Sequence, residues 1–406
     1  QECLVKEISA LIRNSNAQQI ANRLSLSTSD SSKKLFLDSL ATKSYQAALS
    51  ECERAMSDDW AEVVCHCVFA AQRKRAGQWS EACTHQESAV EAFLRVFKSL
   101  NRIFVPVLKA LILDLRRLAA QADRALRQSG NAEDANKLEG AGRVLRKCLA
   151  QEMKDEENPP PVSRTWAALY VANQCNQVFF SLNTLKHVKS LVLPGQMAVE
   201  EFPLPDRITW SFFQGRMALL DGQLDKAETD LSFAFNNTPP THISNRRRVL
   251  IYLIPVRLML HQARPGPGRR AGVPTEEMLA RYRLPQFAAL ARAFREGHIG
   301  DFDQALEDHQ EFLVRKGVYM LLHRLKLLVY RNLFKRAHAV VRHTHPTQVK
   351  LEVFVCAVRA CRVTADQEQV ECMLANLIHQ GLVKGYIAHK QQVVVLKKDD
   401  PFRTNP

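Results

Sequence analysis

The side chains of this sequence with the clearest chemical potential are cations that have no acidic neighbours. From Phe312 to Leu351 there are nine Lys or Arg and no Asp or Glu. A solvated helix face usually interleaves acids that pair with bases one turn away. An acid-free face therefore favours contact with phosphates or with an acidic protein, and an unpaired solvated face is the alternative. Four cations line up along a predicted helix of this region: Arg324, Arg331, Lys335 and Arg342.

A second group of cations lies near the end of the chain, where no acid interrupts residues 373–398. Lysines that contact phosphates position a nucleic-acid strand without reading its bases. The helix predicted over residues 365–381 carries acids and no Lys or Arg, which disfavours base reading by that helix. We therefore predict RNA or DNA binding that tolerates sequence and weakens with salt. The cations of this second group are Lys384, His389, Lys390, Lys397 and Lys398.

Catalytic and metal-binding motifs are missing from the sequence. There is no P-loop, no G-x-S-x-G turn and no H-E-x-x-H helix. The stretches "CHC" at Cys65–Cys67 and "HTH" at His343–His345 contain metal-ligand side chains, but neither has a partner at zinc-finger spacing. We predict a protein that is not an enzyme and that holds no cofactor and no metal.

The composition indicates a densely helical globular protein. Gly and Pro number only 15 and 17 among 406 residues, and 46% of the residues are hydrophobic. A net charge of +14 favours nucleic acid or an acidic partner. No segment approaches the roughly 18 apolar residues of a membrane span, and the ten cysteines lack the dense spacing of a disulfide scaffold. We predict no membrane contact, and reduced, mostly buried thiols in a nuclear or cytosolic compartment.

Three short segments predict helical hairpins along the chain. They are "GQWSEA" from Gly77, "GQLDKA" from Gly222 and "GDFDQA" from Gly300. In each, the Gly is expected to end one helix in a left-handed conformation, the next apolar residue to start another, and the Ala to allow close packing. The segments resemble tetratricopeptide hairpins, but their spacing has no fixed period. We therefore predict an irregular helical solenoid.

The last hundred residues predict three helices and a hairpin, which is the order of a winged helix. The helices are expected over residues 317–345, as one long helix or two nearly continuous ones, and over 348–361 and 365–381. Asp366 is the expected N-cap of the last and Gly381 its C-terminal stop. Two β-rich runs, Leu382–Ile387 and Val393–Lys397, flank a polar turn and form the wing. The predicted core stripe of the first helix is Val318, Leu322, Leu325, Val329, Leu333 and Val340.

Several long phrases in this part of the chain resemble a known family. The resemblance is to the PCI domain-containing protein 2 family, the PCI subunits of the nuclear-pore-associated mRNA-export (transcription-export) complex. It is strongest from Trp210 to Phe402. The phrases that carry it are "LIYLIPVRLML" (Leu250–Leu260), "LPQFAALARAFREG" (Leu284–Gly297), "LVYRNLFKRA" (Leu328–Ala337) and "LANLIHQGLVKGYIAHKQQVVV" (Leu374–Val395).

This resemblance implies a non-catalytic protein that assembles with other subunits in the nucleus. The implied partners are a large helical scaffold subunit and a small acidic, mostly disordered tether protein, with paired winged helices acting as a nucleic-acid platform. The Gly- and Pro-rich segment Arg264–Pro274 looks like an insertion relative to the family, and no role is carried onto it.

The sequence therefore predicts an all-α fold, an irregular tetratricopeptide-like solenoid that ends in a winged-helix PCI domain with a small β-hairpin. The predicted function is a scaffold subunit at the nuclear pore with a basic winged helix for RNA or DNA. The alternative is a pure protein-assembly subunit of a PCI complex, as in the signalosome, proteasome lid or translation-initiation assemblies. The predicted divisions are a helical-repeat region (1–205), a helical PCI subdomain (206–315), a winged helix (316–400) and a tail (401–406).

Overall fold

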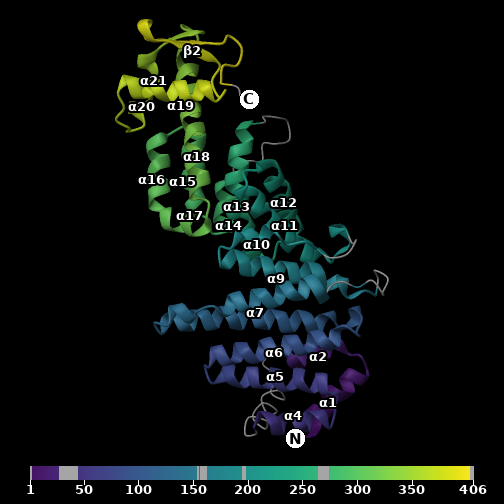
Figure 1. Ribbon diagram of the computed structural model, residues 1–406. Helices are drawn as coiled ribbons and strands as arrows, with labels where there is room; N and C mark the ends of the chain where they lie inside the picture. The colour runs from purple at the N-terminus through teal and green to yellow at the C-terminus, as the bar shows by residue number, and fades with distance from the viewer. Residues whose placement is uncertain are drawn as a thin grey trace. The chain divides into compact units, whose positions relative to one another are not determined.

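The computed structural model describes residues 2–26, 44–152, 155, 162–193, 198–263 and 274–402. Contacts group the chain into two compact units, Gln1–Trp210 and Ser211–Pro406. Both are helical, and the only sheet in the described residues is a small three-stranded one near the C-terminus (Figure 1). The predicted all-α solenoid ending in a winged helix is confirmed. Except for Pro274, the segment Arg264–Pro274 lies outside the described residues.

The N-terminal unit is built of helical hairpins in which neighbours along the chain pack side by side. In Figure 1, helices α5, α6, α7 and α9 are stacked one above the next in successive layers. The elements are α1 (Glu2–Arg13), α2 (Ala17–Leu24), α4 (Tyr45–Glu53), α5 (Asp58–Arg75), α6 (Trp79–Phe97), η1 (Arg102–Phe104), α7 (Val105–Gln128), η2 (Ala132–Asp134), α8 (Lys137–Lys147), η3 (Cys148–Glu152), η4 (Arg164–Ala167), α9 (Ala168–Ser181), α10 (Leu185–Lys189) and η5 (Val199–Glu201). Helix α11 (Leu204–Leu220) includes the residues at which the two units divide.

Buried carboxylates tie distant parts of this unit together. Asp123 on α7 accepts hydrogen bonds from the backbone N–H groups of Lys137 (2.8 Å) and Leu138 (3.0 Å), which are otherwise unsatisfied at the start of α8. Asp114 accepts one from the N–H of Leu26, 88 residues away (2.6 Å). The core around them is apolar, with Phe93, Phe97 and Leu108 fully buried.

The C-terminal unit continues the hairpins and then forms the winged helix. Its hairpin elements are α12 (Leu224–Asn237), α13 (Ile243–Ala263), α14 (Glu276–Arg281), α15 (Gln286–Glu296), α16 (Ile299–Asp308) and α17 (Gln310–Lys316). The winged part consists of α18 (Tyr319–Arg324), α19 (Lys326–Val341), β1 (Gln348–Lys350), α20 (Leu351–Ala360), α21 (Gln367–His379), β2 (Gly385–Ala388), η7 (His389–Gln391) and β3 (Val393–Leu396).

Two of the three predicted hairpin turns are confirmed and one is wrong. Gly77 (φ +74°) and Gly222 (φ +75°) are left-handed residues between α5 and α6 and between α11 and α12. Gly300, by contrast, lies inside the first turn of α16, and Gly297 (φ +72°) ends the preceding helix. Gly300 is needed for packing instead, because a Cβ there would lie 2.2 Å from the carbonyl oxygen of Cys361.

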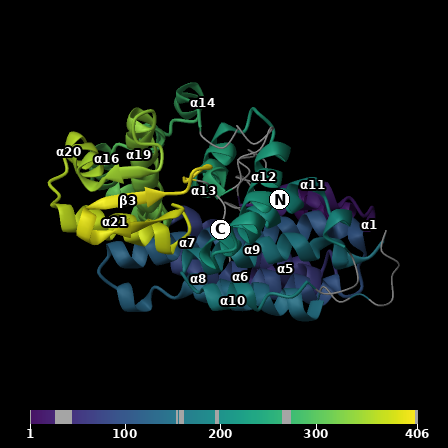
Figure 2. The same ribbon diagram turned by 90° about the horizontal axis from the view of Figure 1, so that it is seen from above.

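The sheet is larger than the predicted hairpin. Strands β2 and β3 pair antiparallel as predicted, and β1 pairs with the other edge of β3, in the order β1-β3-β2. Residues 348–350 were predicted to start a helix, but they form β1 and the helix begins at Leu351. Figure 2 shows the strands beside α21, whose predicted N-cap Asp366 and C-terminal stop Gly381 (φ +69°) are confirmed.

The cysteines agree with a further prediction. Among the cysteines whose side chains the structure describes, all but Cys356 and Cys372 are buried, as predicted. None of the described helices is both long and apolar enough to cross a membrane.

Candidate nucleic-acid interface

The first helix of the winged part is two helices, α18 and α19, that meet at Leu325. Most of its predicted apolar stripe is confirmed, because Val318 to Leu333 of that stripe are buried. Val340 was predicted to belong to it, but that side chain is 81% exposed. After Leu333 the protected side of α19 passes through Phe334, His338 and Val341. Val340 lies on the other side of the helix, which faces solvent.

Three of the four cations predicted on this helix are exposed. Arg324 lies at the end of α18, Lys335 in α19 and Arg342 directly after α19. Lys335 and Arg342 are about two helical turns apart and therefore lie on the same side of α19. None of the three has an acidic side chain within ion-pair distance in the described part of the chain.

Arg331 is not a surface residue, so its predicted exposure is wrong. Its side chain is 3% exposed and donates hydrogen bonds to the carbonyl oxygen of Phe402 and to Asn332 Oδ1 (3.0 Å). Burial lowers the pKa of Arg331. Arg331 is buried because the C-terminal segment folds back onto α19. Phe402 of that segment is itself buried, and the centre of its ring lies 5.6 Å from the centre of the His338 ring. Phe402, predicted to belong to a tail, is therefore part of the fold.

The register of the sheet divides the wing residues between two faces. Val349 and Val394 are opposite each other and fully buried, so that face covers the helices. Alternation places the other residues on the second face, which we name the open face. It consists of Gln348 and Lys350 (β1), Val393 and Val395 (β3), Lys397 after β3, Tyr386 and Ala388 (β2), and Lys384 before β2.

The structure brings two predicted lysines together on this open face. Lys384 and Lys397 are paired across the strands, since the N–H of Lys397 donates to the carbonyl oxygen of Lys384 (2.9 Å). Lys397 is exposed and Lys384 is half-buried. Lys390 and Lys398 are also exposed, in the wing turn and after β3. Whether these lysines bind phosphate stays a prediction.

His389 contacts an acidic side chain of this chain, and its predicted contact with nucleic acid stays a prediction. Its Nδ1 lies 2.7 Å from a carboxylate oxygen of Glu371 on α21, and the imidazole is otherwise largely exposed. The contact fastens the wing turn to α21, so His389 is already engaged by an acid of this chain. Glu371 was noted in the sequence only as an acid that disfavours base reading.

Two open-face residues were missed by the sequence analysis. Lys350 was assigned to a helix, and Tyr386 was not singled out, although it is 62% exposed on β2. The alternation "QVK" before the helix and "KGYIA" in the wing was the available signal for both.

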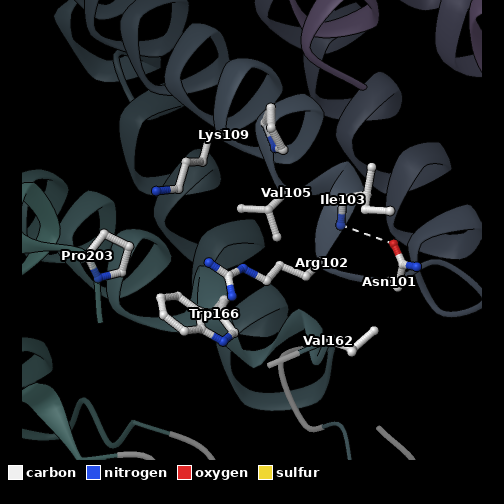
Figure 3. Close-up of a pocket in the computed structure, with 9 residues that line it drawn as sticks. Asn101, Arg102, Ile103, Val105, Lys109, Val162, Trp166 and Pro203 are labelled. Carbon is white, nitrogen blue, oxygen red and sulfur yellow. Dashed lines mark hydrogen bonds between the residues drawn. The ribbon is translucent and has the colours of Figure 1, made fainter. Parts of the chain in front are cut away.

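The N-terminal unit contains a pocket of about 530 Å³ (Figure 3). The Arg102 guanidinium lies 3.6 Å from the centre of the Trp166 ring, and Lys109 pairs with Asp206 (2.8 Å). These cations are engaged by a ring and by an acid, and the rest of the lining is mainly apolar. The described lining can therefore hold an apolar group. Its lining residues are Asn101, Arg102, Ile103, Val105, Pro106, Lys109, Val162, Trp166 and Pro203.

The motifs considered as metal ligands are engaged in other contacts. His66 of "CHC" is hydrogen-bonded through Nε2 to the Tyr45 hydroxyl (2.9 Å) and through Nδ1 to His85 Nδ1 (3.2 Å). Burial, followed by the neighbouring His85, lowers the pKa of His66 to about 4. Within the described ranges, no cluster of three or more His, Cys, Asp or Glu side chains is placed to hold a metal ion.

Comparison with known proteins assigns the chain to a family. The PCI domain matches residues 306–398. PCI domain-containing protein 2 of Danio rerio is 32% identical over 360 residues, which cover 87% of this chain and 86% of that protein. Enhanced ethylene response protein 5 of Arabidopsis thaliana is 32% identical over 352 residues (85% and 81%), and Protein CSN12 homolog of Schizosaccharomyces pombe is 25% identical over 376 residues (87% and 85%). With a winged helix at the position of its PCI domain, the chain belongs to the PCI domain-containing protein 2 family.

Proposed function

We propose that this protein is a non-catalytic scaffold subunit of a multisubunit PCI complex that acts in mRNA export coupled to transcription at the nuclear pore. Its partners in this proposal are a large helical scaffold protein and a small acidic, disordered tether protein. Family membership and the C-terminal PCI domain support the assembly role. The helical-repeat architecture supports it as well, because such repeats offer extended surfaces to partners.

The second part of the proposal is that the winged part binds RNA or DNA without reading sequence. The observation that carries it is the cationic side of α18 and α19, two helices that contain no Asp or Glu. Lys326 of α19 pairs with Asp303, but Arg324, Lys335 and Arg342 remain exposed and without an acidic partner in the described chain. Helix α21, which would enter a major groove in a sequence-reading winged helix, has an acid at its N-cap and Glu368 in its first turn. Backbone contacts without base contacts are the expected result.

Reversing the charge of these three residues tests the proposal. We expect the variant Arg324→Glu, Lys335→Glu, Arg342→Glu to bind labelled RNA and duplex DNA much more weakly in fluorescence anisotropy. Each phosphate contact contributes about 0.7 to the slope of log affinity against log salt for single strands, so losing three contacts flattens the slope by about 2. Arg331 is left unchanged because it is buried.

A matched control reverses three exposed cations of the N-terminal unit: Arg124, Arg127 and Lys147. This variant has the same net charge as the first, so a general charge effect would weaken both equally. The proposal fails if the two variants bind alike, or if neither differs from the original chain.

A second candidate function, protein assembly without nucleic acid, is favoured by a separate observation. Three consecutive helices of the C-terminal unit each carry a large exposed apolar side chain: Val314 (55%) on α17, Met320 (67%) on α18 and Val340 (81%) on α19. We infer that these three side chains belong to a surface that packs against another subunit, since contiguous exposed apolar patches mark such surfaces. If purified chain binds neither RNA nor DNA at low salt, this second function becomes the better account.

A further inference from the structure

The open face of the sheet combines an exposed aromatic ring with lysines. Tyr386 is 62% exposed, and it lies opposite Val395 in the central strand. Lys384 and Lys397 form the neighbouring pair on the same face, one on each of the two strands. Lys350 lies at the other edge of the sheet, opposite Val393. None of the residues of the open face is acidic.

The dimensions of this face suit a short stretch of one strand. Neighbouring β-strands are about 4.8 Å apart, so three strands span about 10 Å. Gly385 permits this close pairing, since a Cβ there would lie 2.2 Å from the carbonyl oxygen of Val395. On the open face, Val393 and Val395 lie on the central strand, with Lys350 on the strand at one edge and Lys384 beside the strand at the other.

We propose that the open face binds one or two nucleotides of single-stranded RNA or DNA, with a base stacked on Tyr386 and phosphates held by Lys384, Lys397 and Lys350. The proposal rests on the nucleic-acid binding proposed above and adds to it a ligand form and a stacking residue. Aromatic rings bind unpaired bases regardless of their identity because every base has a π-face. A duplex offers only its backbone to such a surface, since its bases are stacked on each other.

The lysines are the reason for preferring nucleic acid over a protein on this face. Tyrosine is enriched in the centre of protein interfaces, but lysine is depleted there. Here the face that carries Tyr386 also carries Lys350, Lys384 and Lys397, and none of the residues that define the open face is acidic. That arrangement complements a polyanion carrying aromatic rings better than it complements an apolar protein surface.

The test compares Tyr386→Ala with Tyr386→Phe in the full chain. The probes are a labelled oligouridylate and a duplex DNA of equal length, measured by anisotropy over a salt series. Tyr386→Ala is expected to weaken oligouridylate binding by roughly 5- to 100-fold, which is the effect of removing one stacked base. Its duplex affinity and salt slope should not change, because no charge is removed. Tyr386→Phe, which keeps the ring, should retain oligouridylate affinity.

A second variant and a control separate the possible outcomes. Replacing Lys350, Lys384 and Lys397 by Gln should weaken oligouridylate binding and flatten its salt slope. Met320→Ala, which removes another exposed apolar side chain of the same unit, should change neither probe. Ultraviolet cross-linking of the oligouridylate should label the peptide that contains Tyr386.

Three results would overturn the inference. If the original chain binds the oligouridylate and Tyr386→Ala binds it equally well, the stacking role is wrong while the proposed function stands. If the original chain binds neither probe, the proposed function fails and the stacking site fails with it. If Tyr386→Ala changes which proteins co-purify with the chain but leaves oligouridylate affinity intact, the open face is a protein interface.

Discussion

At the scale of single residues, the cluster of Tyr45, His66 and His85 contributes to how the stability of the protein depends on pH. His66 has a pKa of about 4 in the fold against 6.5 as a free side chain, first because of burial and then because of His85. Burial also lowers the pKa of His85. Since the unfolded chain takes up the proton first, the stabilising contribution of the neutral imidazole is complete above pH 6.5 and is lost as the pH falls towards 4.

We therefore expect the free energy of unfolding to fall between pH 6.5 and 4 and to fall less in His66→Gln. The site is partly exposed and screened, so a difference of about 1 kcal/mol between the two proteins is expected across this window. Urea titrations followed by tryptophan fluorescence at several pH values measure it. Parallel pH curves for the two proteins would contradict the prediction.

At the scale of elements, glycine contacts determine how closely helices approach. Gly222 and Gly297 have nearly the same left-handed conformation, φ +75° and +72°. A Cβ at Gly222 would meet nothing within 4 Å, whereas one at Gly297 would lie 2.5 Å from the backbone nitrogen of Leu333 on α19. The two positions thus share a conformational cost and differ only in packing.

Gly222→Ala is expected to reduce stability by about 1 kcal/mol, the cost of a left-handed Ala. Gly297→Ala should cost about 3 kcal/mol or more, because α15 and α19 must also move apart. Urea unfolding followed by circular dichroism measures both in the C-terminal unit. If both variants lose the same free energy of unfolding, the contact with Leu333 adds no measurable cost and the prediction is wrong.

At the scale of the whole molecule, the chain divides into two compact units, Gln1–Trp210 and Ser211–Pro406. All four tryptophans of the chain lie within residues 1–210, so tryptophan fluorescence reports on the N-terminal unit. Asp123→Ala removes the acceptor of the two backbone N–H groups at the start of α8. It should lower the free energy of unfolding of that unit by about 1–3 kcal/mol. Leu374→Ala leaves a cavity at a fully buried position of the C-terminal unit and should lower the free energy of unfolding by about 2–5 kcal/mol.

We expect Asp123→Ala to lower the thermal midpoint seen by tryptophan fluorescence, and Leu374→Ala to lower a second calorimetric transition while leaving the fluorescence midpoint in place. Separate compact units need not unfold together, so two transitions are expected. A fluorescence midpoint that moves with Leu374→Ala would mean that the chain unfolds as one cooperative body.

The sequence by itself determined the features that depend on neighbours within a few residues. Helical periodicity identified the buried stripe from Val318 to Leu333. The turns at Gly77 and Gly222 followed from a glycine with an apolar residue two positions later. Asp366 was recognisable as an N-cap, because a capping side chain bonds to a backbone N–H only three residues away. The wing strands β2 and β3 were likewise recognisable from their alternation.

Only the tertiary structure decided which cations remain on the surface. Arg331 looks like Lys335 along the helix, yet it is buried by Phe402, a residue 71 positions away. Strand β1 exists because residues 348–350 pair with the end of the chain, and His389 is held by Glu371 of another element. These contacts join residues that are far apart in sequence, so no local pattern specifies them. Periodicity identifies which side of an element is apolar, but chain folding determines what covers the other side.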